Sequence, residues 1–176
     1  MSTSGAGYDQ MPGIDELRTN VLVALADTPH PLVAVTSPGD DTRRLDVAAA
    51  LAAAVEQTGR RVALVDADVS ESRDGSAAPA RTATITAPAV AESNAALLVA
   101  EDFRDLLADT ADAHDLVVVA CPPVLDVAET RAVTAACSAT VLVASQRTSR
   151  RDSTVQAATV LREAGARLLG VALRRS

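Results

Sequence analysis

The chain has 176 residues, of which 16 are basic and 23 are acidic, so its formal net charge is −7. Every basic residue is an arginine, which excludes chemistry that needs a lysine, such as Schiff-base catalysis or the phosphate-binding lysine of a P-loop. Tyr8 and Phe103 are the only aromatic residues, which argues against stacked-base recognition of single-stranded nucleic acid. The pI near 4.7 argues against a nucleic-acid partner of any kind that binds through its phosphate backbone.

The composition predicts one ordinary domain behind a short tail. Apolar residues make up 48% of the chain, which is enough for a hydrophobic core. We expect residues 1–11 to form a disordered tail and residues 12–176 to form a single domain. The longest apolar runs, Val47–Val55 and Leu116–Leu125, are shorter than the ~18–20 residues that span a bilayer, and the N-terminus has no signal-peptide pattern. These features predict a cytoplasmic protein without direct membrane insertion.

Apolar periodicity predicts helices and strands that alternate along the chain. The predicted helices are 13–26, 45–55, 95–111, 127–136 and 151–164, and the predicted strands are 32–36, 61–65, 82–86, 115–120, 139–144 and 167–173. Continuous Val- and Leu-rich strands between helices indicate an α/β fold, doubly wound, with a mostly parallel sheet covered by helices on both faces. Ligands bind at the carboxyl ends of the strands in such sheets, which directs attention to 36–45, 66–68, 120–126 and 145–150.

Five segments, in this order, resemble the bacterial tyrosine kinases of exopolysaccharide assembly: AVTSPG…VAAALAAA, RRVALVDADV, HDLVVVACPPVLDVAET, SQRTSRRD and AGARLLGVALRR. The resemblance runs from about Ile14 to Arg174. Those kinases are deviant P-loop ATPases related to the ParA/MinD group. The resemblance therefore implies a P-loop NTPase-like fold, ATP and Mg²⁺ as the family's cofactors, and a membrane chain-length regulator as its partner.

The first strand ends in the segment that corresponds to the phosphate loop of these kinases. Their pattern is close to TSxxPGEGKST, whereas this chain reads TSPGDDTRRLD over residues 36–46. Asp41 and Arg43 stand at loop glycines, and Arg44 stands where the lysine reaches the β- and γ-phosphates. Leu45 replaces the hydroxyl that holds Mg²⁺. Two interpretations stay open: an arginine-based phosphate site, or, as we favour, a charged and solvated loop.

The next two strand ends carry the family's acidic motifs. Asp66 and Asp68 in VDADV match the second motif, whose carboxylates orient magnesium, water or the acceptor hydroxyl. Such a pair is able to bind a hard cation, but it is equally suited to a helix cap and a hydrogen bond within the core. The motif VIIDTPP becomes VVVACPP, so Ala120 replaces the carboxylate that holds the metal-bound water.

The remaining candidates predict no catalytic or metal site. Cys121 and Cys137 lie in apolar stretches without metal-ligand spacing, which predicts two small buried thiols. We expect structural roles for His30, in a Pro-flanked loop, and for His114, which precedes a strand at the opposite end of the sheet. No Ser/His/Asp or Cys/His constellation is recognisable.

Two further family features are absent from the sequence. There is no C-terminal tyrosine cluster for autophosphorylation, and the oligomerisation signature ExxRxxR survives only as Arg18, with Pro12 and Asp15 at its other charged positions. This loss argues against a ring-shaped homo-oligomer.

Three hypotheses follow from the sequence. The first is a non-catalytic pseudo-kinase or pseudo-ATPase whose surface binds a membrane chain-length regulator or an active kinase of polysaccharide export, and which is held peripherally at the membrane through that partner. The vestigial nucleotide site of this hypothesis consists of Gly39, Thr42, Arg43, Arg44, Asp66 and Asp68. The alternative is a divergent nucleotide-binding ATPase or tyrosine kinase that uses Arg43, Arg44, Asp66 and Asp68. A weaker alternative is a ParA/MinD-like positioning protein.

Overall fold

The computed structural model describes residues 11–39, 43–67, 83–86, 101–146 and 149–174. Its helices are α1 (Ile14–Ala24), α2 (Arg43–Glu56), α3 (Glu101–Ala113), α4 (Thr130–Ala136) and α5 (Arg151–Glu163). Its strands are β1 (Leu32–Thr36), β2 (Val62–Asp66), β3 (Ala83–Thr86), β4 (Leu116–Ala120), β5 (Ala139–Ser145) and β6 (Leu168–Arg174).

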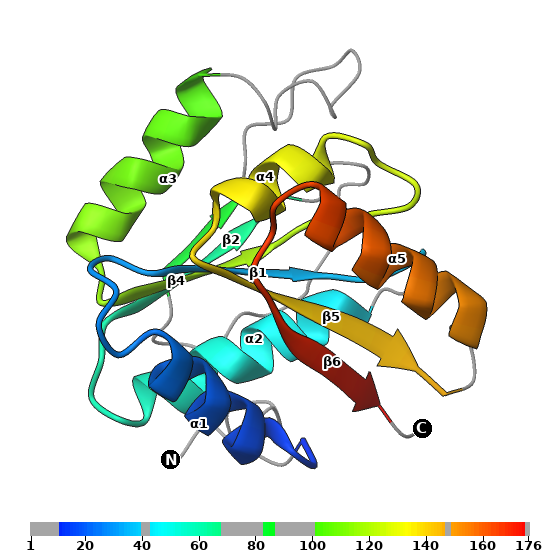
Figure 1. Ribbon diagram of the computed structural model, residues 1–176. Helices are drawn as coiled ribbons and strands as arrows, with labels where there is room; N and C mark the ends of the chain where they lie inside the picture. The colour runs from blue at the N-terminus through cyan, green and yellow to red at the C-terminus, as the bar shows by residue number, and fades with distance from the viewer. Residues whose placement is uncertain (1–10, 40–42, 68–82, 87–100, 147–148, 175–176) are drawn as a thin grey trace.

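The strands form one sheet in the order β3-β2-β4-β1-β5-β6, and every described pair is parallel (Figure 1). The predicted α/β doubly wound fold is therefore confirmed. The short strand predicted over 82–86 is β3, and the predicted helix 95–111 is α3, whose first six predicted residues lie outside the described residues. The predicted tail also lies outside them, apart from Met11, which packs against the core.

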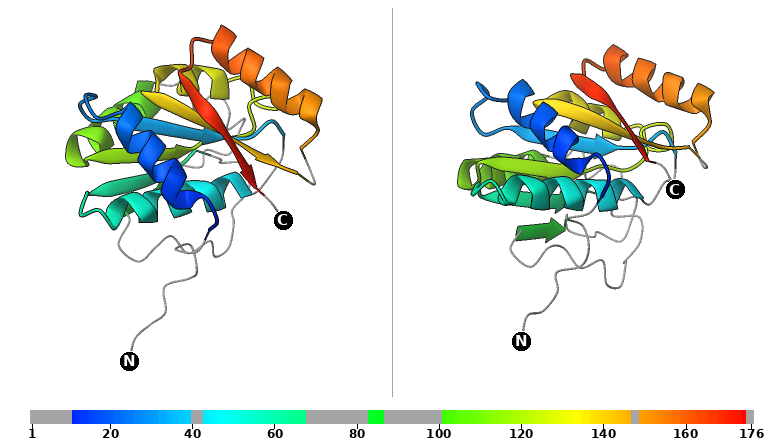
Figure 2. Two further views of the ribbon diagram at one scale, coloured as in Figure 1. Left: turned by 60° about the horizontal axis from the view of Figure 1, so that its bottom comes forward. Right: turned by 90° about the horizontal axis from the view of Figure 1, so that it is seen from below.

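Helices cover both faces of the sheet, as Figures 1 and 2 show. On one face, α1 and α2 pack on alternate strand residues such as Val35, Leu64 and Val118. On the other face, α3 and α4 cover Val65 and Val119, and α5 covers Leu142. Alternate side chains of a strand point to opposite faces, so strands buried on both faces must be apolar throughout, as these are. This explains why the apolar runs located the central strands correctly.

Two glycines end helices through their left-handed backbone. Gly59 follows α2 with φ 87° and donates its N–H to the Glu56 carbonyl, and Gly165 follows α5 with φ 85°. A residue with a Cβ adopts this conformation at a cost, so glycine is favoured after a helix. Both helices therefore turn back promptly toward the amino edge of the sheet, where the next strand begins. No helix in the described ranges is both long and apolar enough to span a bilayer.

Candidate functional site at the carboxyl edge of the sheet

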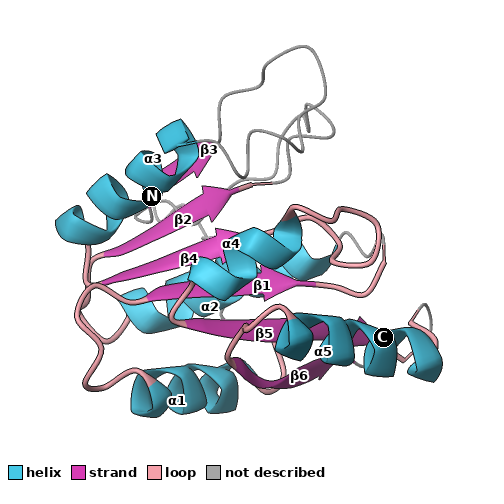
Figure 3. Ribbon diagram, turned by 45° about the horizontal axis from the view of Figure 1, so that its top comes forward, coloured by secondary structure: helices cyan, strands magenta, loops and turns pink. Residues whose placement is uncertain are grey.

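The carboxyl ends of β1, β2 and β4 lie at the same edge of the sheet (Figure 3). β1 and β4 are neighbours, with Val35 beside Ala120, and β2 lies on the other side of β4, with Asp66 beside Ala120. The Ala67 N–H donates to the Ala120 carbonyl over 2.9 Å. Parallel pairing thus brings the three segments singled out in the sequence to one place, as the rule for ligand sites in such sheets predicts.

The loop that follows β4 is tied closely to the end of β1. The Val124 N–H donates to the Ser37 carbonyl over 2.9 Å, and the Leu125 N–H donates to the Pro38 carbonyl over 3.3 Å. The hydroxyls of Thr36 and Thr130 both donate to the Pro122 carbonyl, over 2.7 and 3.3 Å. These bonds fix the β4–α4 loop against the entrance to the phosphate loop, so neither segment is free to move alone.

Arg44 is buried at the centre of this edge. Only 2% of it is exposed, and its Nε donates to the Cys121 carbonyl over 3.0 Å. The side chain thus reaches from the first turn of α2 to the residue that follows β4. The expectation of a solvated loop is therefore wrong for Arg44, because α2 begins at Arg43 and not at Leu45. The helix turns the guanidinium inward, where a backbone carbonyl accepts its hydrogen bond.

The neighbours of Arg44 do not supply the groups that hold a magnesium ion in the kinases. Leu45 packs its side chain partly against the core between α1, α2 and the sheet. Ala120 is buried at the end of β4 and carries only a methyl group. Asp66 is half-buried at the end of β2 and takes part in a polar interaction. A methyl group and an isobutyl group cannot ligate a hard cation, so this edge does not fit a family-type Mg²⁺–ATP site.

The structure adds a carboxylate that the sequence had not singled out. Asp126, in the β4–α4 loop, has its Oδ2 3.8 Å from where a Cβ on Gly39 would lie. The Ser37 hydroxyl donates to the Gly39 carbonyl over 2.6 Å, within the same turn. An exposed carboxylate beside the phosphate-loop segment opposes an anion there. No sequence signal identifies Asp126, because the contact joins two loops that are far apart along the chain.

The other predicted site residues are placed only in part. Arg43 begins α2, but its side chain is outside the described residues, as are Thr42 and Asp68 entirely. Among the site residues the structure brings together, Gly39 lies beside Asp126, while Arg44 and Asp66 lie near the end of β4. No group of three or more His, Cys, Asp or Glu side chains suited to a metal is found within the described part of the chain.

The two cysteines are buried, as predicted. Burial raises the pKa of Cys137 to about 12. Burial also raises the pKa of Cys121 well above its ordinary value, with Cys137 adding to the rise, Arg44 opposing it and Asp66 adding to it. Thiolates are the reactive form of cysteine, so neither residue is suited to act as a nucleophile.

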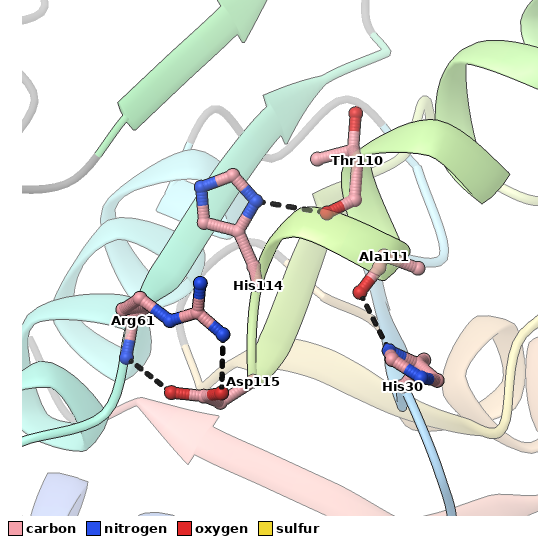
Figure 4. A network of polar contacts seen from close by, with 6 residues as sticks. All are labelled: His30, Arg61, Thr110, Ala111, His114 and Asp115. Atoms are coloured by element: carbon pink, nitrogen blue, oxygen red, sulfur yellow. Dashed lines mark hydrogen bonds and ion pairs between the residues drawn. The ribbon is translucent and has the colours of Figure 1, made fainter.

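The histidines lie at the amino edge of the sheet, opposite the candidate site (Figure 4). The Nδ1 atoms of His30 and His114 lie 3.0 and 2.8 Å from the carbonyls of Ala111 and Thr110, at the end of α3. Beside them, the Arg61 N–H and guanidinium both donate to the Asp115 carboxylate, over 2.8 and 3.0 Å. These contacts hold helix ends and strand starts together, in agreement with the predicted structural roles of the histidines.

Comparison with known proteins identifies solved structures with the same fold. No protein-family model and no curated protein matches the chain. The kinase domain of the Escherichia coli tyrosine kinase ETK has a TM-score of 0.83 and 21% identity, and the match covers 99% of this chain and 82% of that one. The BceF tyrosine kinase domain has a TM-score of 0.78 and 22% identity, over 93% of this chain and 76% of that one.

A ParA family ATPase from Chlorobium tepidum is less similar. Its TM-score is 0.53 and its identity 17%, with 82% of this chain and 72% of that one covered. The fold is therefore the P-loop NTPase-like α/β fold of bacterial tyrosine kinase domains, which confirms at the level of structure the resemblance that the sequence carried.

We expect both thiols to resist modification in the folded protein. Ellman's reagent at pH 8 should leave Cys121 and Cys137 unmodified, because burial raises their pKa and blocks access. Unfolding in urea should release both thiols. Val155→Cys, at an exposed position on α5, provides the matched reactive control and should react within minutes. Rapid reaction of a native cysteine in the parent would contradict the burial.

We also expect Asp115 to contribute to stability in a pH-dependent way. Its hydrogen bonds from Arg61 lower its pKa from the ordinary 3.8, so the contribution is present above pH 3.8 and disappears as the pH falls through the lowered value. Asp115→Asn should lower the free energy of unfolding at pH 7 slightly, since the pair is exposed. The difference from the parent should close in acid, which urea denaturation at a series of pH values measures. A difference that stays constant down to low pH would contradict the prediction.

Proposed function

We propose that this protein is a non-catalytic relative of the bacterial tyrosine kinases, a pseudo-kinase that keeps their fold and acts as a regulatory or scaffolding partner. One observation carries the proposal. Arg44 stands where the kinases have their phosphate-binding lysine, yet its guanidinium is buried and bonded to the Cys121 carbonyl. A guanidinium that is bonded to a backbone carbonyl elsewhere in the chain is not available to a γ-phosphate.

The chemistry of Arg44 differs from that of lysine in ways that matter here. A guanidinium is planar, carries a fork of donors and is bulkier than an ammonium group, so it cannot follow the slim path of a lysine past the phosphate-loop backbone. Withdrawing it from the Cys121 carbonyl would leave a buried acceptor without this partner, at a cost of about 1–3 kcal/mol. Binding of a phosphate through Arg44 would have to offset that cost first.

The metal side of the kinase reaction lacks its groups as well. Leu45 and Ala120 replace the hydroxyl and the carboxylate, and both side chains belong to the apolar core. Asp126 beside Gly39 adds negative charge near the phosphate-loop segment, where the kinases bind an anion. These features support loss of phosphotransfer, and the well-packed scaffold around them supports retention of another role.

By analogy with the kinases that the sequence resembles, we infer that the partner is a membrane chain-length regulator or an active kinase of polysaccharide export. The protein would then be cytoplasmic and held at the inner face of the membrane through that partner. Neighbouring genes for glycosyltransferases and a flippase would support this assignment. A DNA-partition operon would favour a ParA-like role instead, to which the TM-score of 0.53 gives weaker support than the 0.83 for the kinase domain.

A divergent nucleotide site is the second candidate, and one observation favours it. Asp66 is half-buried beside Ala120 at the carboxyl edge, so a carboxylate remains close to where the kinases bind their metal. Together with Arg43, Arg44 and Asp68 it would have to form a nucleotide site of a new kind. Nucleotide titration separates the two candidates directly.

We expect Mg²⁺–ATP and Mg²⁺–GTP at millimolar concentration to leave the thermal midpoint of the protein unchanged. A ligand present at about 100 times its Kd stabilises a protein by about 2.7 kcal/mol, which shifts the midpoint by several degrees in a domain of this size. Differential scanning fluorimetry with and without Mg²⁺ measures this. A rise of several degrees that requires Mg²⁺ would refute the pseudo-kinase proposal and support the divergent site.

Restoring the family residues should recover some nucleotide affinity. The variant carries Asp41→Gly, Arg43→Gly, Arg44→Lys, Leu45→Ser and Ala120→Asp. The Asp41 change alone removes a carboxylate whose repulsion of a phosphate at ~5 Å is about 3 kcal/mol at an effective dielectric of 20, and amides at the helix N-terminus then favour the anion.

The matched control for this variant keeps Arg44 and carries the other four changes. Calorimetry should detect ATP binding to the five-residue variant and not to the control, because only the five-residue variant lacks the Arg44 guanidinium. Circular dichroism establishes that both are folded. A folded five-residue variant that ignores ATP would mean that the correspondence between this segment and the kinase phosphate loop is wrong.

A further inference from the structure

The described part of the chain has no strand beyond β6 at one side of the sheet. β6 is the last strand in the order, and among the described residues only β5 pairs with it (Figure 1). It is seven residues long, like β5, whereas β3 at the other end has four. An edge strand of this length presents a row of backbone N–H and C=O groups that are able to pair with another chain. Its sequence, LLGVALR, contains no proline, a residue that commonly blocks such edges.

Apolar side chains are exposed along the same edge. The large apolar residues with the greatest exposure in the described part of the chain are Val23 (72%), Val155 (59%), Leu173 (57%) and Val171 (45%). Val171 pairs with Leu142 and Leu173 pairs with Ala144. Neighbours in register point to the same face of a sheet, and Leu142 belongs to the core beneath α5, so Val171 and Leu173 lie on the α5 side.

Val155 belongs to the same region. α5 begins at the carboxyl edge, directly after β5, and runs back along β6 (Figure 3). Its second turn carries Val155, and α5 packs on the same face of the sheet as Val171 and Leu173. We call these three residues together with the backbone of β6 the β6 edge. Three of the four exposed large apolar side chains thus accompany the one long strand with an open side.

The charge of this region is opposite to that of the rest of the protein. Residues 150–174 contain five arginines and two acidic residues, although the whole chain has a net charge of −7. Arg167 precedes β6 and Arg174 ends it, so the strand has a basic residue at each end. The Arg167 guanidinium is exposed and also donates to the Ala24 carbonyl at the end of α1, over 3.1 Å. Arg150 and Arg151 lie exposed at the start of α5. An acidic ligand is attracted to such a surface, and complementary charge favours both its encounter and its register.

We propose that the β6 edge binds an extended acidic segment of a partner protein, which adds to the sheet as a further strand beside β6. Backbone hydrogen bonds to β6 supply affinity, as in other cases of strand addition. Apolar side chains at alternate positions of the segment cover Val171 and Leu173, and acidic residues at its ends lie level with positions 167 and 174, where the sequence has arginines. The β6 edge is separate from the vestigial nucleotide site, so this inference goes beyond the proposed loss of catalysis.

A second copy of the chain fits the edge less well. Two copies of the segment 167–174 that pair antiparallel about its centre place Arg167 of one copy opposite Arg174 of the other, at both ends of the pair. Like charges directly opposite each other on neighbouring strands are destabilising. An acidic partner strand converts both of these repulsions into attractions.

The test uses a labelled peptide with the full-length protein. The probe is an acetylated, fluorescein-labelled peptide of sequence DEVTVTVED, which alternates valine and threonine between acidic ends. We expect fluorescence anisotropy to show binding at low salt, weakening by about tenfold or more at high salt as the charges are screened. A peptide with the same centre and lysine ends, KKVTVTVKK, should bind at least about tenfold more weakly.

Three variants locate the binding. Val171→Asp and Leu173→Asp each place a carboxylate on the β6 edge and should weaken binding by about tenfold. Ala108→Asp introduces the same carboxylate at an exposed apolar residue on α3, which packs on the β2 and β4 half of the sheet, and it should leave the affinity within about twofold. Amide hydrogen exchange should slow within residues 168–174 when the peptide binds, because strand addition protects backbone N–H groups.

Three results would overturn the proposal. Absence of binding at millimolar peptide, or equal affinity for the lysine-ended peptide, would exclude an acidic partner strand. Equal loss in Ala108→Asp would exclude the β6 edge as the site. A parent dimer in sedimentation equilibrium that Val171→Asp converts to a monomer would assign the edge to a second copy. None of these results depends on nucleotide binding, so failure here is distinguishable from failure of the pseudo-kinase proposal.

Discussion

A charge removed from water needs hydrogen-bond acceptors around it, and the carboxyl edge of this sheet is organised by that requirement. Arg44 is almost wholly buried, and the Cys121 carbonyl accepts from its Nε. Cys121 is free to offer that carbonyl because β4 has ended one residue earlier, while its N–H still donates to the Val35 carbonyl. Through Cys121, the guanidinium on α2 is thereby linked to the end of β4 and to β1, at the point where related folds bind phosphate.

The same requirement explains why the surrounding loops are closely bonded. The Pro122 carbonyl accepts from two threonine hydroxyls, and the two N–H groups that follow Pro123 bond to the carbonyls of Ser37 and Pro38. In a nucleotide-binding protein, such loops satisfy part of their hydrogen bonding through the ligand. Here much of it is satisfied within the chain. Loops that are bonded in this way among the described residues have less to gain from a nucleotide, and this is the physical basis of the pseudo-kinase proposal.

Much of the fold could be predicted from the sequence, because its central strands are buried on both faces and read as uninterrupted apolar runs. The start of α2 could not, since the pair Arg43-Arg44 is typical of an exposed loop and nothing local shows that the first turn buries one of them. Asp126 was missed for a related reason: its approach to Gly39 depends on how two loops pack. Local patterns report on strands and helices, whereas the site is made by tertiary contacts.

The carboxyl ends of the strands and the outer side of β6 differ in how far their polar and apolar groups are bonded or packed within the described structure. At the carboxyl edge, Arg44 has a backbone acceptor, and the apolar side chain of Leu45 is packed into the core. At β6, backbone groups of an edge strand and the side chains of Val171 and Leu173 remain exposed to water in the described structure. Exposed backbone and apolar surface favour association, whereas satisfied groups do not. This contrast supports both proposals, that the chain binds a partner strand beside β6 and that it does not transfer phosphate.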